Sequence, residues 1–221
     1  MRSPALAPFV LTVTLLASGC SQTPSATPST DAASAPATTP STPIPAPTES
    51  RSEEEVVLSM ETFVYTRDGV TETISLDDGA RILAALEEIT GHVPTPVELD
   101  EWYSRGLVEY EWPHVRVLMS AEDQSRVWIT VSAPEIDGVP FRTVEGIAVG
   151  STRADAVAAG ASDLWDEDGD GIADHLRLGR HEVPGTTSLV TGEVGILFVE
   201  LAVEDDVVSR ISAPMNDFSD I

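Results

Sequence analysis

The stretch VRVLMSAEDQSRVWITV, residues 115–131, decides the fold. Apolar residues stand at every second position in 115–119, and the same alternation returns in 127–131 after a turn at 121–125. Successive side chains of a β-strand point to opposite faces, so this pattern predicts two antiparallel strands that share one apolar face. Residues 108–112 alternate in the same way and add a third strand to this meander.

Further strands are expected on both sides of the meander. Asp68-Gly69 is a tight-turn signal between two alternating segments, which predicts a hairpin. Asp205-Asp206 is a second turn signal, and it follows an almost unbroken apolar run. The strands expected outside the meander cover residues 56–65, 70–76, 141–147, 175–183, 196–203 and 207–212.

Two short helices are also expected. Asp77-Asp78 is an N-cap signal for the first helix, and Gly91 ends it. Thr152 opens the second helix, because its spacing from Asp155 is that of a capping box, and Gly160 closes it. The sequence therefore predicts an α+β domain that is mostly antiparallel sheet. The apolar face of the first helix contains Ile82, Leu83, Leu86 and Ile89.

The chain carries one internal similarity. Ser132-Ala133-Pro134 and Ser212-Ala213-Pro214 follow equivalent strands and lie 80 residues apart. One interpretation is a tandem repeat, in which residues 53–137 and 138–221 each form a helix and an antiparallel meander. The other is chance, because the chain is rich in alanine and proline.

Residues 1–19 form a predicted signal peptide. The apolar segment 5–17 is shorter than the roughly 20 residues that a membrane-spanning helix needs, and a basic residue precedes it. Ala17-Ser18-Gly19-Cys20 resembles the lipobox of bacterial lipoproteins, in which the cysteine is acylated and becomes the first residue of the mature chain. The resemblance implies a lipid anchor at Cys20 and a location on the extracellular face of the cell membrane. An ordinary secreted protein is the alternative.

Residues 20–52 contain little besides serine, threonine, proline and alanine. Such a segment buries too little apolar surface to offset its ordering entropy, so it is expected to be a disordered stalk. Residues 53–221 then form a single domain. Cys20 is the only cysteine, so this domain must fold without a disulfide.

The charge of the chain is strongly acidic, with 37 acidic and 12 basic residues and a net charge of −25. Every basic residue is arginine. A basic patch that binds nucleic acid is therefore excluded. The acidity suits cations or basic partners, but it is more typical of a soluble protein surface, which is the preferred interpretation.

Several segments together resemble an uncharacterised family of actinobacterial surface lipoproteins. They are the hairpin at Asp68-Gly69, the helix end 86–94, the strand 109–112, the turn 146–151 and the closing strand 211–214. The resemblance implies display at the cell surface, and the family has no assigned activity.

The Gly150-Ser151-Thr152 helix start, followed by antiparallel strands, is similar to the repeat of the beta-lactamase inhibitor protein family and of small outer-membrane assembly lipoproteins. This second resemblance implies a concave sheet surface that grips another protein.

The segment DEDGDGIAD, residues 166–174, is the strongest local motif. Carboxylates at alternate positions beside glycines converge on one point and suit Ca²⁺. The loop lacks the final glutamate of an EF-hand, since Arg177 stands there, and it is closer to the short calcium loops of extracellular repeat proteins. An acidic turn without a metal is the alternative. The predicted ligands are Asp166, Asp168, Asp170, the backbone carbonyl of Ile172, and Asp174.

Catalytic signals are weak, and no residue is predicted to be catalytic. Glu109 and Glu111 share a strand face and could pair for glycoside hydrolysis, but a solvated strand face is the commoner meaning of this pattern. The predicted function is a binding module for a protein or an envelope ligand. The alternative is a hydrolase of envelope polymers that uses paired carboxylates. Tryptophan is favoured at interfaces, and the candidates are Trp102, Trp112, Trp128 and Trp165.

Overall fold

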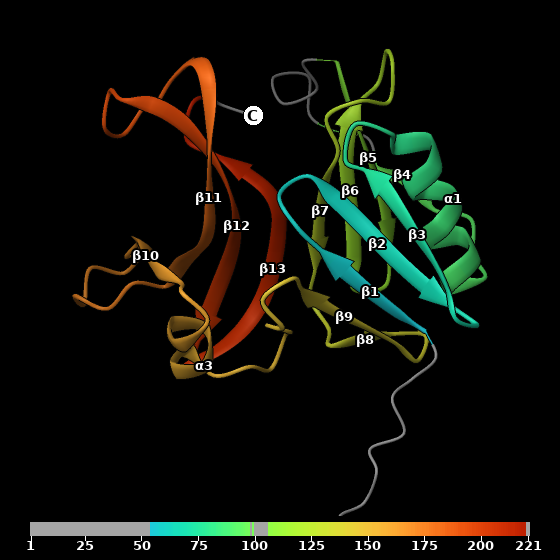
Figure 1. The fold of residues 1–221 in the computed structure, drawn as a ribbon, viewed down its shortest axis with the longest axis horizontal. Helices are drawn as coiled ribbons and strands as arrows, with labels where there is room; N and C mark the ends of the chain where they lie inside the picture. Colours follow the sequence, from blue (N-terminus) through green and yellow to red (C-terminus); the bar gives the residue numbers. More distant parts are fainter. Residues whose placement is uncertain (1–53, 98, 100–105, 220–221) are drawn as a thin grey trace, which may run out of the picture. The chain divides into compact units, whose positions relative to one another are not determined.

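The computed structural model describes residues 54–97, 99 and 106–219, which form two β-sheets and two helices (Figure 1). Most strand pairs are antiparallel, which confirms the predicted α+β class with mainly antiparallel sheet. The predicted signal peptide, Cys20 and the stalk lie outside the described residues. Neither helix in the described part of the chain combines the length and the apolar run that crossing a membrane requires.

The smaller sheet has five strands in the order β3-β2-β1-β9-β8. The hairpin predicted at Asp68-Gly69 is confirmed, and both residues adopt positive φ angles, of 50° and 75°. The pair β1–β9 is parallel and places Val56 opposite Phe141. The strands are β1 (Glu55–Leu58), β2 (Thr62–Arg67), β3 (Val70–Ser75), β8 (Glu135–Ile136) and β9 (Val139–Thr143).

The predicted strand 56–65 is wrong, because the chain turns in its middle. Ser59 Oγ accepts hydrogen bonds from the backbone N–H groups of Glu61, at 3.1 Å, and Thr62, at 2.9 Å. This turn ends β1 and starts β2, and the two strands pair with each other. The predicted strand 141–147 is also shifted, since β9 ends at Thr143.

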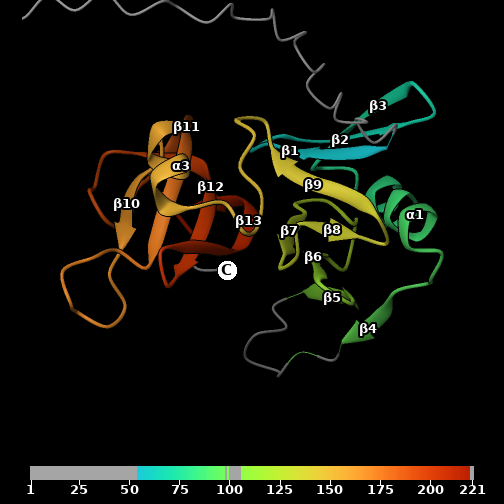
Figure 2. The same cartoon turned by 90° about the horizontal axis from the view of Figure 1, so that it is seen from below.

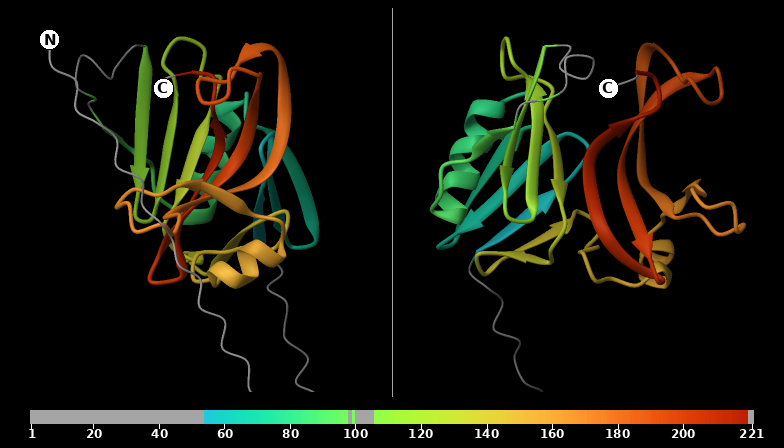
Figure 3. Two further views of the ribbon diagram at one scale, coloured as in Figure 1. Left: turned by 90° about the vertical axis from the view of Figure 1, so that its left-hand side faces the viewer. Right: turned by 180° about the vertical axis from the view of Figure 1, so that it is seen from behind.

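The larger sheet has eight strands in the order β10-β11-β12-β13-β7-β6-β5-β4, all antiparallel (Figure 3). The predicted meander forms one half of it. In its turn, Asp123 accepts hydrogen bonds from the hydroxyl and the N–H of Ser125, and these lower the pKa of Asp123 to about 2. The strands are β4 (Thr95–Val97), β5 (Leu107–Trp112), β6 (Val115–Ser120), β7 (Trp128–Val131), β10 (Ser162–Trp165), β11 (His175–Thr187), β12 (Val194–Glu204) and β13 (Val207–Asn216).

Both predicted helices are present, as α1 (Gly79–Thr90) and α3 (Arg153–Ala158). Asp78 caps α1 by accepting a hydrogen bond from the N–H of Arg81, and Gly91 ends it in the left-handed conformation. Thr152 and Asp155 form the predicted capping box, and the Thr152 hydroxyl lowers the pKa of Asp155.

Two hydrophobic clusters form the core. The first lies between α1, the five-stranded sheet and strands β5 to β7, and it includes Val139 and Phe141. It therefore extends past the predicted division at residue 137. The second lies between residues 147–161 and strands β11 to β13. Figure 2 shows α1 beside the five-stranded sheet and α3 beside β10 to β12.

Both clusters rest on the same face of the eight-stranded sheet. An apolar row runs from one cluster to the other through residues that lie directly opposite each other on neighbouring strands. Because neighbouring side chains on a strand point to opposite faces, the residues adjacent to this row must face away from the core. The row contains Trp112, Val115, Val131, Ile211, Leu201 and Leu176.

Candidate binding face and acidic loop

A row of polar side chains crosses the eight-stranded sheet on the face opposite the two clusters. Each strand contributes one residue, and each residue lies directly opposite the next along the row. The six inner residues are sequence neighbours of the apolar row, so their side chains point away from the core, and the two end residues of the row lie directly opposite the outermost of them. From β4 to β10 the row contains Thr95, Glu111, Arg116, Thr130, Ser212, Glu200, Arg177 and Ser162.

An ion pair and a histidine–glutamate contact are built into this face. Glu109, on β5, is only 8% exposed, and its two carboxylate oxygens accept hydrogen bonds from Nη2 of Arg116 at 2.7 and 2.8 Å. In the other half of the sheet, Nδ1 of His175 lies 2.5 Å from Oε1 of Glu200. Each of these glutamates is therefore engaged by a neighbouring strand.

The face is hollowed where its two halves meet. A depression of about 270 Å³ lies there, lined by Trp128 from β7 and by Arg210 from β13, among others. Trp165 lies opposite His175 at the edge of the sheet and is 63% exposed. The polar row, together with Glu109, Trp128, Trp165, His175 and Arg210, is called the polar face below.

The arginines of the domain divide into two groups. Six of the described arginines form ion pairs with carboxylates; they are Arg67, Arg81, Arg116, Arg142, Arg153 and Arg180. The other three described arginines have no carboxylate within ion-pair distance in the described part of the chain. Arg177 and Arg210 belong to the polar face, and Arg126 precedes β7.

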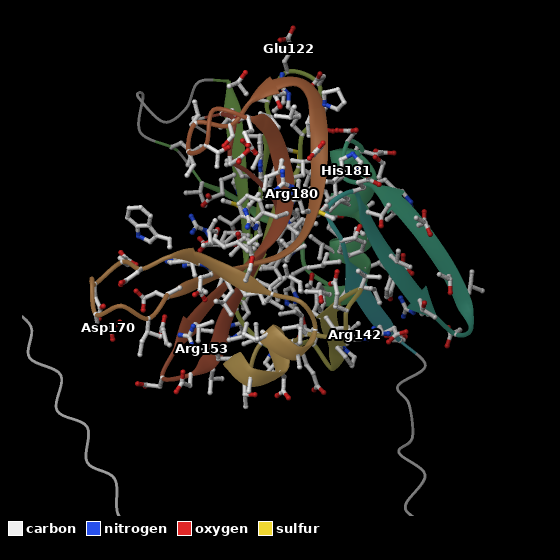
Figure 4. All side chains as sticks on the ribbon, turned by 60° about the vertical axis from the view of Figure 1, so that its left-hand side comes forward. Glu122, Arg142, Arg153, Asp170, Arg180 and His181 are labelled. Atoms are coloured by element: carbon white, nitrogen blue, oxygen red, sulfur yellow. The ribbon has the colours of Figure 1, made fainter. Side chains whose placement is uncertain are left out.

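The acidic loop 166–174 connects β10 to β11, and Asp170 lies at its outer end (Figure 4). Its carboxylates accept hydrogen bonds from the loop's own backbone. Asp166 accepts from the N–H groups of Gly169, at 2.7 Å, and Gly171, at 2.9 Å. Asp174 accepts from the N–H of Glu167 at 2.7 Å. These bonds hold the side chains toward the inside of the loop.

The loop brings three of its four aspartates together. Asp166, Asp168 and Asp174 each offer one carboxylate oxygen, and these oxygens lie within 4.8 Å of one another. Three hard oxygen ligands at this spacing could hold a metal ion. Asp170 lies outside the group, and its Oδ1 accepts a hydrogen bond from the N–H of Ile172 at 2.7 Å.

The acidic loop contacts the polar face through His175. Nε2 of this ring lies 3.5 Å from Oε2 of Glu167, while Nδ1 faces Glu200. The loop also begins directly after Trp165. A change in loop conformation would therefore act on two residues of the polar face.

The other residues that the sequence suggested as site residues do not come together in one site. Trp102 lies outside the described residues. Trp112 is buried, and its indole N–H donates to the carbonyl of His92 at 3.0 Å, so it belongs to the core. Glu111 is exposed on the same face as Glu109. Because Arg116 engages both oxygens of Glu109, these two carboxylates do not form the free pair that a glycosidase uses.

Sequence reasoning missed the polar face as a whole. Arg177 stands between Leu176 and Leu178, and Arg210 directly precedes Ile211, which was a visible signal that both arginines face away from the core. Their place beside Thr130 and Arg116 depends on pairing between β7 and β13, which lie some 80 residues apart, and no local pattern encodes it.

The fold and the polar face thus define an α+β domain with one core-packed and one polar sheet face. Comparison of the chain with family models, with curated proteins and with solved structures finds no match.

Proposed function

We propose that this chain is a lipid-anchored binding module on the extracellular face of the cell membrane. In this proposal, Cys20 carries the anchor, residues 20–52 are the stalk, and the domain binds a protein or an envelope ligand. The observation that supports binding is the polar face, which presents arginine and tryptophan side chains without a free catalytic pair.

The chemistry of the partner follows from the charges of the polar face. Its three arginines balance its three glutamates, whereas the whole chain has a net charge of −25. Arg177 and Arg210 lack carboxylate partners within the described residues and can form bidentate pairs with carboxylates of another molecule. A partner whose contact surface carries acidic groups beside apolar ones fits this face.

Replacing Arg210 with glutamine should weaken partner binding at least tenfold, because it removes an unpaired guanidinium from the centre of the polar face. The full chain carrying Cys20→Ser would be used to capture partners from membranes of its own organism, and affinity would then be measured with the purified partner. Arg81→Gln is the matched control, since Arg81 lies on α1 and pairs with Glu72. Equal affinities for the two variants would contradict the proposal.

A hydrolase of envelope polymers is the alternative function. It needs one carboxyl group as acid and a second as base or nucleophile. The ion pair between Glu109 and Arg116 favours the binding function over this alternative.

We also propose that the acidic loop binds Ca²⁺ through Asp166, Asp168 and Asp174. The proposal rests on the three oxygens gathered within 4.8 Å. Extracellular calcium sites often have dissociation constants of about 0.1 to 1 mM, so a site with few protein ligands would be filled at the cell surface.

Adding 10 mM Ca²⁺ should stabilise the domain by about 1.4 to 2.7 kcal/mol if the dissociation constant is about 0.1 to 1 mM. This corresponds to a rise in melting temperature of roughly 3 to 10 °C, and Asp168→Ala should abolish it. Glu122→Ala, on an exposed turn far from the loop in the sequence, should keep the full rise. Asp170→Ala tests whether the fourth predicted aspartate also takes part. Identical melting in chelator and in Ca²⁺ would exclude the site.

We further propose that the two halves of the domain are tandem repeats. Val131 and Ile211 lie directly opposite each other where β7 pairs with β13, and their separation of 80 residues equals that of the two Ser-Ala-Pro segments. Each half contributes four consecutive strands to the larger sheet. This arrangement supports the resemblance to the beta-lactamase inhibitor protein repeat, and with it the expectation of a sheet face that grips a protein.

A further inference from the structure

One pocket in the described residues has a volume of about 870 Å³. It lies where β7 and β13 stop pairing. Residues Ile129 to Val131 of β7 pair with β13. Beyond this paired part, Trp128 of β7 lines one side of the pocket, and Pro214 and Asn216 of β13 line the other. The turn between β1 and β2 and the far part of β11 complete its walls. This pocket is distinct from the depression on the polar face, although Trp128 borders both.

The walls of this pocket are mainly apolar. The apolar residues that line it include Met60, Trp128, Val183, Leu197, Pro214 and Phe218. Pockets of about 300 to 1,000 Å³ with apolar walls and a few polar groups are the usual sites of small molecules. The volume and the lining therefore suit a small molecule with a substantial apolar body.

Four charged or titratable side chains line the same pocket. His181, on β11, faces the turn between β1 and β2, and its Nδ1 lies 3.7 Å from Oε1 of Glu61 (Figure 4). Asp77 lies two residues beyond the end of β3. Arg126 is exposed and has no hydrogen bond or ion pair in the described part of the chain.

Arg126 is one of seven described non-glycine residues with a positive φ angle. Its φ angle is +53°, a left-handed conformation that costs a residue with a side chain about 1 to 2 kcal/mol. Strained residues of this kind gather at ligand sites, where the surrounding structure holds them. Arg126 is one of three described arginines without an ion pair, and it is the one whose pocket, at about 870 Å³, is large enough for a small molecule with an apolar body.

We propose that the pocket binds an amphipathic anion, whose carboxylate or equivalent group pairs with Arg126 and whose apolar body packs against Trp128 and Leu197. The site is separate from the polar face and does not depend on the function proposed for that face. Acyl chains and aromatic acids share this chemistry, and competition experiments can distinguish them.

The probe for this site is 8-anilinonaphthalene-1-sulfonate, whose fluorescence rises when it enters an apolar pocket. The full chain carrying Cys20→Ser should bind it saturably at one site, and Arg126→Gln should weaken binding at least tenfold. Arg180→Gln is the matched control, because it removes the same charge from a neighbouring part of β11 that does not line the pocket. Dodecanoate should displace the probe if the site takes acyl chains, and 1-naphthoate should do so if it takes aromatic acids.

Val183→Trp should abolish probe binding by filling the pocket. Equal affinities for Arg126→Gln and Arg180→Gln would overturn the proposal, as would probe binding that survives Val183→Trp. Because Arg126 is exposed and unpaired, its replacement should leave the melting temperature unchanged, so the result does not depend on the folding of the tryptophan variant. Partner capture by the polar face is measured separately, and its failure would leave this test intact.

Discussion

Replacing Phe141 with alanine is expected to lower the free energy of unfolding by about 3 to 5 kcal/mol. Phe141 is 1% exposed and lies in the first hydrophobic cluster. Its ring meets that of Phe63 edge to face, with centroids 6.4 Å apart and an interplanar angle of 71°. Alanine would remove this contact and leave a cavity between the two sheets, where neighbouring side chains can collapse only in part.

Urea denaturation would measure this loss as a lower midpoint with an unchanged slope. Val144→Ala is the matched control, because Val144 follows β9 directly but is 62% exposed, and its replacement should change stability by less than about 0.5 kcal/mol. If the two variants were equally stable, β9 could not be an integral part of the first cluster.

The elements that could be predicted from sequence are those whose signals are local. The meander of β5 to β7 follows from alternation alone, and the capping box at Thr152 and Asp155 marks the start of α3. In both cases, the residues that determine the element lie within a few positions of one another. A period of two or a capping spacing is therefore sufficient evidence.

The errors arise where a local pattern continues through a structural boundary. Met60 keeps the alternation of 56–65 intact, but Ser59 caps a turn there because its hydroxyl satisfies two backbone N–H groups. The parallel pairing of β1 with β9 has no local signal either, since Val56 and Phe141 are 85 positions apart. Pairings of this kind are selected by burial in a shared core rather than by neighbouring residues.

The candidate site also has parts that the local sequence predicts and parts that it does not. The acidic loop could be found because its carboxylates are close in sequence, although which three of them converge depends on the loop backbone. The shared face of Glu109 and Glu111 was also predictable. The partner of Glu109 required the register of the β5–β6 hairpin, which places Leu118 opposite Glu109 and Arg116 opposite Glu111.

Replacing Arg116 with leucine is expected to destabilise the domain by about 1 to 3 kcal/mol. The side chain of Glu109 is only 10% exposed, and Arg116 supplies every hydrogen bond recorded for its carboxylate within the described residues. Leaving a buried carboxylate without its partner costs about 3 to 5 kcal/mol, but Arg116 is 55% exposed, so water reaches the pair and reduces the loss. Thermal or urea denaturation would measure it.

The double variant Glu109→Gln/Arg116→Leu separates the loss of the ion pair from a general loss of packing. It removes the stranded charge while keeping a side chain of similar size, so it should regain most of the stability lost in Arg116→Leu. If the double variant were as unstable as the single one, the contribution of Arg116 would lie in the packing of its aliphatic part. If the double variant instead regained the lost stability, the main role of Arg116 would be to neutralise Glu109. Arg177 and Arg210 would then be the arginines of the polar face that can bind a partner.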